Sequence, residues 1–181
     1  RARALSTLLS AQNPDGGWGY RQGSSWTEPT ALSVLALTGE PAAAGCRERG
    51  VRLLTSLARP DGGWPPSASV NQSTWVTALA FMAGGDGLSK GARDRSIQWL
   101  LGQSGEETHY FNKLRLRLLG LRDKRNEGEG WPWFPDTAAW VSPTALTINA
   151  LEAAGVEAAK PRIVSARDFL RSRMCQDGGW N

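Results

Sequence analysis

Two carboxylates in this sequence, Glu28 and Asp136, stand where they could do acid–base or cation chemistry. Glu28 lies two residues before a Thr-Ala-Leu sequence that opens a predicted helix, and Asp136 lies shortly before Trp140. A carboxylate at such a place could serve as a general acid or stabilise a cation. A plainer interpretation is open for each, because a first-turn Glu favours the helix dipole and Asp is common in loops beside a helix start.

Tryptophan is abundant, with 9 residues in a chain of 181. Many of these rings lie at or near the N-terminal ends of predicted helices. Aromatic faces attract cations and also line pockets for apolar chains, although core packing would explain the same residues. The candidate ligand-binding residues are Trp26, Trp75, Trp131, Trp133 and Trp140, with Phe134 in the same cluster.

Metal and thiol chemistry have little support. The chain has a single His, His109, so a zinc site built from several imidazoles is impossible. Cys46 and Cys175 lie far apart and form no Cys-x-x-Cys motif, so neither a disulfide framework nor a zinc ribbon is indicated. We therefore predict no metal site and no cofactor.

The tryptophans and glycines belong largely to an internal repeat. Asp-Gly-Gly-Trp occurs at 15–18, 61–64 and 177–180, with a degenerate copy at 128–131, and Thr-Ala-Leu occurs at 30–32, 77–79 and 144–146. We expect each Asp to bond the turn amides, Gly to supply a positive φ, and Trp to pack across the helix ends of the neighbouring repeat. The predicted structural residues are Asp15, Trp18, Asp61, Trp64, Asp177 and Trp180.

Between these turns the hydrophobic periodicity predicts pairs of helices. One member of each pair is apolar around most of its circumference and should be buried, and the other is amphipathic and should lie outside. The expected inner helices are 26–38, 73–83 and 140–154, and the expected outer helices are 2–11, 44–58, 90–102 and 161–173. The long middle spacing, between Trp64 and Trp131, indicates an insertion at about 105–127.

The repeat resembles a known superfamily. Gln-Asn-Pro-Asp-Gly-Gly-Trp at 12–18 is similar to the QW motif of squalene–hopene and oxidosqualene cyclases, which adds Gln12 to the structural residues. The helix openings at 26–32 and 140–146 also resemble repeats of the superfamily that contains triterpene cyclases and protein prenyltransferase β-subunits. This resemblance implies an all-α fold, an α/α toroid of repeated helical hairpins. About three and a half hairpins are present, roughly half of a complete ring.

The same resemblance implies a domain of an isoprenoid-handling protein that binds a hydrophobic isoprenoid-type ligand. It transfers no catalytic residues, because the chain has neither the Asp-x-Asp-Asp acid motif nor a zinc-ligand set. Whether the chain is an enzyme therefore stays open. The alternative is a non-catalytic binding or assembly module that uses a concave aromatic surface for an apolar ligand or a partner helix.

We expect residues 1–181 to form one domain of a longer chain, or a partial ring completed by a second copy. A net charge of +4 without a basic stripe argues against nucleic-acid binding. The absence of a signal peptide or long apolar run favours a cytoplasmic location. The basic, leucine-containing segment 111–125 could contact an anionic membrane surface, or it could be a solvated face packed on the helices.

Overall fold

The computed structural model describes residues 1–21, 23–106, 118 and 128–180. The predictions for His109 and for the 111–125 segment therefore lie largely outside the described residues. The chain divides into two compact units, Arg1–Gln98 and Trp99–Asn181. The expectation of one domain over 1–181 stays a prediction.

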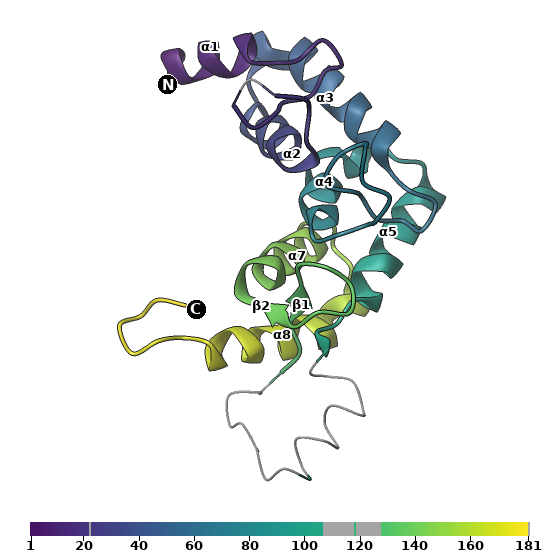
Figure 1. Cartoon of the computed structure of the whole chain (residues 1–181), viewed down its shortest axis with the longest axis vertical. Coiled ribbons are helices and arrows are strands. Elements are labelled where there is room, and N and C mark those ends of the chain that lie inside the picture. Colours follow the sequence, from purple (N-terminus) through teal and green to yellow (C-terminus); the bar gives the residue numbers. More distant parts are fainter. Residues whose placement is uncertain (22, 107–117, 119–127, 181) are drawn as a thin grey trace. The chain divides into compact units, whose positions relative to one another are not determined.

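The first unit is a stack of helical hairpins (Figure 1). Helix α2 contacts both α3 and α4, and α3 contacts α4 as well. Val34, Leu37, Leu54 and Leu79 fill the space between these helices and are at most 2% exposed. The helices of this unit are α1 (Ala2–Ser10), α2 (Thr27–Ala36), η1 (Pro41–Ala43), α3 (Ala44–Leu57), α4 (Val76–Gly84) and η2 (Gly85–Gly87), followed by α5 (Lys90–Gly102), in which the division into units falls.

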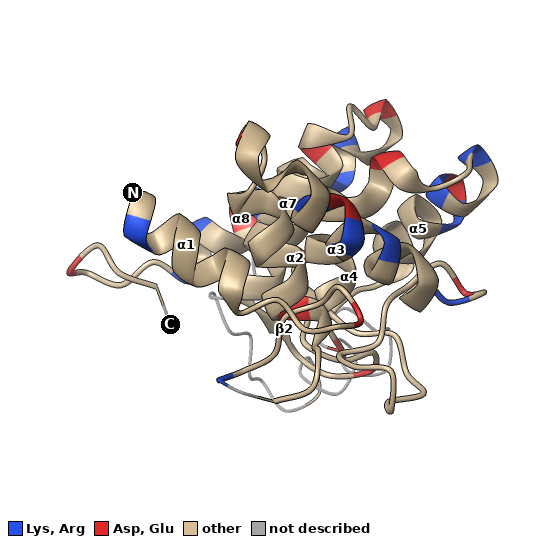
Figure 2. Ribbon diagram, turned by 90° about the horizontal axis from the view of Figure 1, so that it is seen from above, with Lys and Arg blue, Asp and Glu red and all other residues tan. Residues whose placement is uncertain are grey.

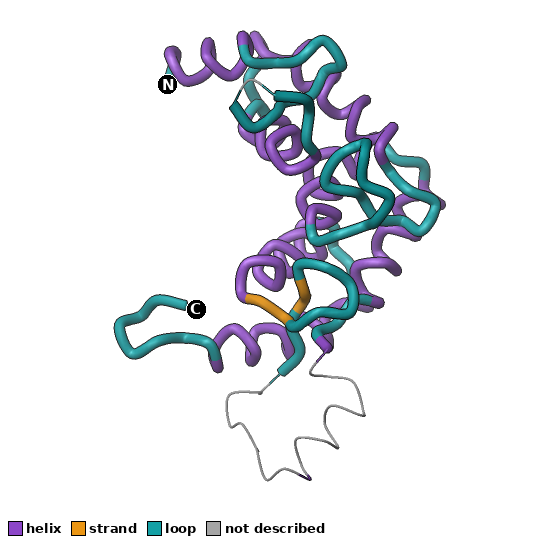
Figure 3. Tube along the Cα trace, viewed as in Figure 1, coloured by secondary structure: helices purple, strands orange, loops and turns teal. Residues whose placement is uncertain are grey.

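The second unit repeats this plan with one hairpin. It contains β1 (Trp131–Pro132), β2 (Ala139–Trp140), α7 (Val141–Ala153), η4 (Glu157–Ala159) and α8 (Lys160–Ser172). Helix α7 packs against α8 and against β1, which pairs antiparallel with β2 in the register Trp131 to Trp140. This small two-stranded sheet was not expected from the sequence, and it forms within the loop that joins the repeat turn to α7 (Figure 3).

The all-α prediction is confirmed, and the seven α-helices of the described residues lie where the periodicity placed them. Helix α4 carries no charged residue and is buried except at Met82, as expected for an inner helix. Charged side chains gather instead on α3 and α5 (Figure 2). Helix α2 departs from this pattern, because Leu32 on it is 47% exposed. None of the described helices is long and apolar enough to cross a membrane.

The Asp-Gly-Gly-Trp turns share one set of hydrogen bonds. In the first turn, Asp15 accepts a bond from the Gly17 amide at 2.9 Å, and Gly16 has a φ of +91°. The Trp18 indole nitrogen donates to the Leu8 carbonyl of the preceding helix at 2.8 Å. The equivalent indole bonds run from Trp64 to Leu54 at 2.7 Å, from Trp131 to Leu100 at 2.6 Å and from Trp180 to Leu170 at 3.0 Å.

The Thr-Ala-Leu sequences have a role that sequence reasoning did not assign. The backbone amide of Trp18 donates to the Thr30 hydroxyl at 2.9 Å. Trp64 bonds Thr77 in the same way at 2.9 Å, and Trp131 bonds Thr144 at 2.8 Å. Because this bond ties each turn to the first part of the following inner helix, it requires the nearly constant spacing from Trp to Thr.

The turn at 177–180 has the Asp and indole hydrogen bonds of the other Asp-Gly-Gly-Trp turns, but its tryptophan is not buried. Trp18, Trp64 and Trp131 are at most 3% exposed, whereas Trp180 is 54% exposed. A Cβ added at Gly16 would meet the Arg49 carbonyl of the next outer helix at 2.8 Å, but one added at Gly178 would meet nothing within 4 Å. The bonds inside the turn therefore form without the next hairpin, and the burial of the indole does not.

Arg162 on α8 bonds backbone groups of residues 103, 129 and 130. Its guanidinium donates to the carbonyls of Gln103 at 3.2 Å and Gly130 at 2.9 Å, and also to the carbonyl of Glu129. The guanidinium carbon lies 4.0 Å from the centre of the Trp131 ring. Burial lowers the pKa of Arg162, and the nearby Glu129 carboxylate opposes this effect. One side chain thus joins the end of α5 to the residues just before β1.

Candidate functional site

Two loops carry most of the predicted site residues. The 18–26 loop and the 131–140 loop each begin at a repeat Trp and end at the residue before an inner helix. Each is closed by antiparallel backbone pairing, between Trp18 and Trp26 in the first and between Trp131 and Trp140 in the second. This pairing places Trp26 at the start of α2 and Trp140 at the start of α7.

Backbone strain is concentrated in these two loops. Among the described residues, the non-glycine residues with a positive φ are Arg21 at +57° and Asp136 at +61°. Such conformations are uncommon outside glycine and tend to occur at functional sites when the surrounding structure holds them. Both loops are therefore better candidates for a site than the regular helices.

The 18–26 loop brings together an aromatic corner, which we define as Tyr20, Trp26 and Glu28. The two rings meet edge to face, with centroids 5.6 Å apart and an interplanar angle of 61°. The Tyr20 hydroxyl donates a short hydrogen bond to Oε2 of Glu28. Tyr20 is 51% and Trp26 36% exposed, so solvent or a ligand can reach both rings. Within the described part of the chain, Glu28 forms no ion pair with a Lys or Arg.

The repeat turn and the next repeat hold this loop in place. Asn13 donates to the Gly23 carbonyl at 3.1 Å, and the Ser25 hydroxyl donates to Asp15 at 2.7 Å. Thr27 bonds the neighbouring repeat, with its amide donating to Pro66 at 2.8 Å and its hydroxyl to Pro65 at 2.6 Å. The residues that build the turn therefore also position the corner.

An apolar surface of α2 begins at the corner. Leu32 is 47% exposed, and of the residues three and four positions further, Leu35 is partly exposed and Ala36 is exposed. Residues at this spacing lie on one face of a helix. The arrangement combines a carboxylate, two aromatic rings and an apolar strip.

The predicted residues are divided between the two units. Trp26 lies in the corner, and Trp75, half-buried, precedes α4 in the same unit. The second unit contains Trp140, 53% exposed, and Trp133, half-buried. Trp131, also predicted to bind a ligand, is 2% exposed and packs as the other repeat tryptophans do. Asp136 is an exposed loop residue.

Sequence reasoning missed Tyr20, although a signal existed. Tyr20 follows Trp18 by two residues, as Trp133 follows Trp131, so an aromatic residue recurs at this place in the repeat. The third repeat also keeps Trp140 at the place of Trp26, but it has Ser142 where the first has Glu28. The carboxylate thus distinguishes the first aromatic site from its repeat.

The environment of Tyr20 predicts an unusual titration. Partial burial, the hydrogen bond to Glu28 and the negative charge of Glu28 raise the pKa of Tyr20 from 10.0 to about 12. Because the folded state favours the protonated phenol, this contribution to stability is present below pH 10.0 and is lost as the pH rises through about 12.

An absorbance titration of tyrosinate should show this late phase, and Tyr20→Phe should remove it. Glu28→Gln should move the Tyr20 pKa down while leaving it above 10.0, since partial burial is the largest cause. Ordinary titration of both tyrosines of the wild-type chain would contradict the placement of Tyr20.

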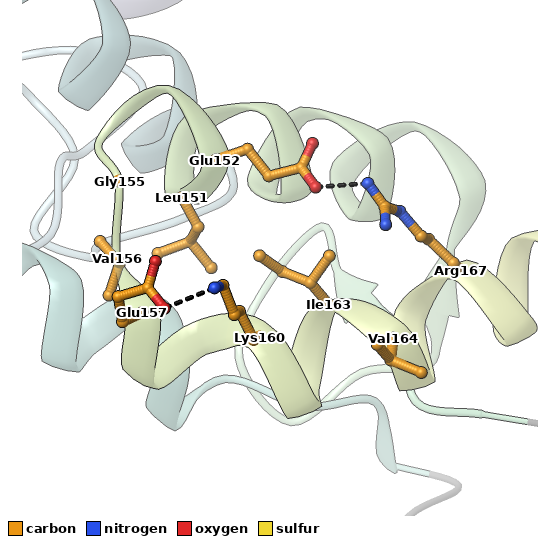
Figure 4. A pocket seen from close by; sticks show the side chains of 9 residues that line it. All are labelled: Leu151, Glu152, Gly155, Val156, Glu157, Lys160, Ile163, Val164 and Arg167. Carbon is orange, nitrogen blue, oxygen red and sulfur yellow. Dashed lines mark hydrogen bonds and ion pairs between the residues drawn. The ribbon is translucent and has the colours of Figure 1, made fainter.

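A second surface feature is a pocket of about 450 Å³ between the end of α7 and the start of α8 (Figure 4). Its floor is apolar and includes Leu151 and Ile163. The charged side chains at its rim are all paired, Glu152 with Arg167 and Glu157 with Lys160. The pocket offers apolar contact but no free charge. In the described residues, no group of three or more His, Cys, Asp or Glu could hold a metal ion.

The fold is similar to that of solved type II terpene cyclase structures. One is an arginine-to-alanine variant of MstE from Scytonema in complex with its substrate geranylgeranyl dihydroxybenzoate, with a TM-score of 0.66 and 19% identity, covering 99% of this chain and 50% of that one. An aspartate-to-asparagine variant with the same ligand gives a TM-score of 0.64 and 19% identity, covering 98% and 49%.

The chain thus spans about half the length of these structures. No protein-family model matches the sequence, and no curated protein matches it. The similarity establishes a terpene-cyclase-like fold.

Proposed function

We propose that this chain is a terpene-cyclase-like domain of an isoprenoid-handling protein, and that the aromatic corner and the exposed face of α2 bind the isoprenoid chain. The observation that carries the proposal is an exposed aromatic pair next to an unpaired carboxylate, continued by the exposed Leu32 on an inner helix. Apolar and aromatic side chains with a few placed polar groups are typical of small-molecule sites. A structure of the same fold holds a geranylgeranyl compound, which supports this ligand class.

Glu28 is the proposed functional carboxylate of this site. It follows Trp26 by two residues in the chain, and it accepts a hydrogen bond from the Tyr20 hydroxyl, which orients it. It could donate a proton to the ligand or stabilise positive charge that forms on it. Asp136 is a weaker candidate, because it is exposed on its loop and the third repeat has Ser142 in place of Glu28.

We also propose that the hairpins are part of an α/α toroid. The exposed Trp180 and the free surface over Gly178 support this, since their counterparts in the other turns are covered by the next hairpin. A continuation of the chain or a second copy would supply the missing half.

The test combines turnover with binding. We expect incubation with geranylgeranyl dihydroxybenzoate, squalene and prenyl diphosphates to give a cyclised product by mass spectrometry. Glu28→Gln should abolish product while leaving ligand binding, measured by calorimetry, within a factor of ~3. Trp26→Ala should weaken binding itself, and Trp140→Ala in the third repeat is the matched control.

The alternative function is a non-catalytic binding or assembly module. The absence of an Asp-x-Asp-Asp motif favours it. Binding of an isoprenoid that depends on Trp26, without turnover of any substrate, would support this alternative. Absence of both binding and turnover would overturn the isoprenoid proposal.

A further inference from the structure

We propose that the aromatic corner binds a small quaternary ammonium group, a ligand class separate from the neutral isoprenoid chain. The inference shares the location of the proposed function but depends on the charge of the ligand. It follows from three properties of Tyr20, Trp26 and Glu28: the shape formed by the rings, the unpaired carboxylate and the difference from the third repeat.

The two rings meet edge to face, with centroids 5.6 Å apart and an interplanar angle of 61°. The edge of one ring lies against the face of the other, so a cation would bind on the outer ring surfaces and not between the rings. With Tyr20 51% and Trp26 36% exposed, a group of alkyl size can reach ring surface. Cations without strong hydration bind such faces, and quaternary ammonium groups are the usual ligands of aromatic cages.

The carboxylate adds a negative charge that no described Lys or Arg neutralises. Eight ion pairs hold other acidic residues of the described chain, such as Glu40 with Arg1 and Glu129 with Arg162, but none involves Glu28. Arg21, next to Tyr20 in the chain, forms no ion pair with it either. The Tyr20 hydroxyl donates to one oxygen, Oε2. Among the described residues, none is seen to bond the other oxygen, Oε1, so the charge of Glu28 can attract a cation bound at the corner.

The third repeat offers a natural control for charge. Trp140 stands at the place of Trp26 and is 53% exposed, but Ser142 replaces Glu28. Aromatic surface without a carboxylate should bind apolar groups with little preference for charge. A preference for a cation should therefore belong to the first repeat alone.

The experiment compares choline with dimethylbutanol, its uncharged carbon isostere. Binding is followed by nuclear magnetic resonance of the Trp26 indole N–H, assigned from its loss in Trp26→Phe. We expect choline to bind at least ~5-fold more tightly than the isostere. Glu28→Gln should remove this preference, and Trp140→Phe should not change it.

Equal affinity for choline and its isostere, or an unchanged preference in Glu28→Gln, would overturn the ammonium site. Isoprenoid binding is measured in parallel to separate the two proposals. If the corner is a neutral apolar site, the protein will still bind the isoprenoid although it shows no preference for choline. Vesicles of phosphatidylcholine and of phosphatidylglycerol distinguish the source of the ammonium group. Sedimentation with phosphatidylcholine alone, dependent on Glu28, would assign a lipid headgroup, and binding of free choline alone would assign a soluble ligand.

Discussion

Gly62→Ala should destabilise the first unit by about 3 kcal/mol. Gly62 has a φ of +93°, which costs an L-residue about 1–2 kcal/mol by itself. The added Cβ would also lie 2.4 Å from the Arg95 carbonyl oxygen and 2.5 Å from its carbon. These are backbone atoms of α5, so they cannot rotate away as a flexible side chain would. The turn or the helix must move, and the indole of Trp64 next to it would lose its close packing.

Gly39→Ala in the same unit is the matched control. Gly39 has a φ of +79°, but a Cβ there would meet nothing within 4 Å. Gly39→Ala should therefore lower the free energy of unfolding only by the cost of a positive φ in an L-residue, about 1–2 kcal/mol. Urea unfolding followed by circular dichroism measures both variants. Similar losses in the two would show that the close approach of the second turn to α5 does not exist in solution.

Trp64→Ala should cost about 3–5 kcal/mol of the free energy of unfolding, the usual range for a buried Trp. Trp64 is fully buried, and its indole nitrogen donates to the Leu54 carbonyl at 2.7 Å. Alanine would leave a cavity between the second turn and α3 and remove the partner of a buried carbonyl. Trp64→Phe should separate the two effects, because it keeps most of the ring but still leaves Leu54 unpaired, at a cost of about 1–3 kcal/mol for that bond.

Trp180→Ala is the comparison for this second prediction. Trp180 donates the equivalent bond to Leu170 at 3.0 Å, but it is 54% exposed. The substitution should lower the free energy of unfolding by about 1 kcal/mol, the usual net contribution of one hydrogen bond. Thermal unfolding at two protein concentrations is the measurement. A loss as large as that of Trp64→Ala would reveal that Trp180 is covered in solution, and a dependence on concentration would identify a second copy as the cover.

The helices and turns could be predicted because their causes are local. The apolar periodicity around Leu54 and Leu79 is a property of a dozen consecutive residues, and so is the turn chemistry of Asp61 and Gly62. The role of Thr77 was less accessible. Its spacing from Trp64 was visible as a repeat, but the hydrogen bond that explains it appears only when the turn folds back on α4.

The candidate site shows the opposite case. Glu28 was visible as a lone carboxylate at an inner helix, and both an acid and a cation-stabilising role were open for it. The recurrence of an aromatic residue at the place of Tyr20 was visible in the sequence, but its bond to Glu28 was not, because the two residues are eight positions apart across an irregular loop. Sequence patterns did not single out Arg162, which is half-buried over the Trp131 ring and bonds three carbonyls.

The sequence by itself determined the repeat: which helices form, which face of each is apolar, and where the Asp-Gly-Gly-Trp turns lie. These features depend on side-chain periodicity and backbone conformation within short segments. Only the tertiary structure decided which aromatic rings are buried in the packing between helices, such as Trp131. It also decided which are exposed near a carboxylate, such as Trp26. The reason is that exposure and charge pairing depend on which neighbouring hairpin covers a residue, and the covering hairpin is distant in the chain.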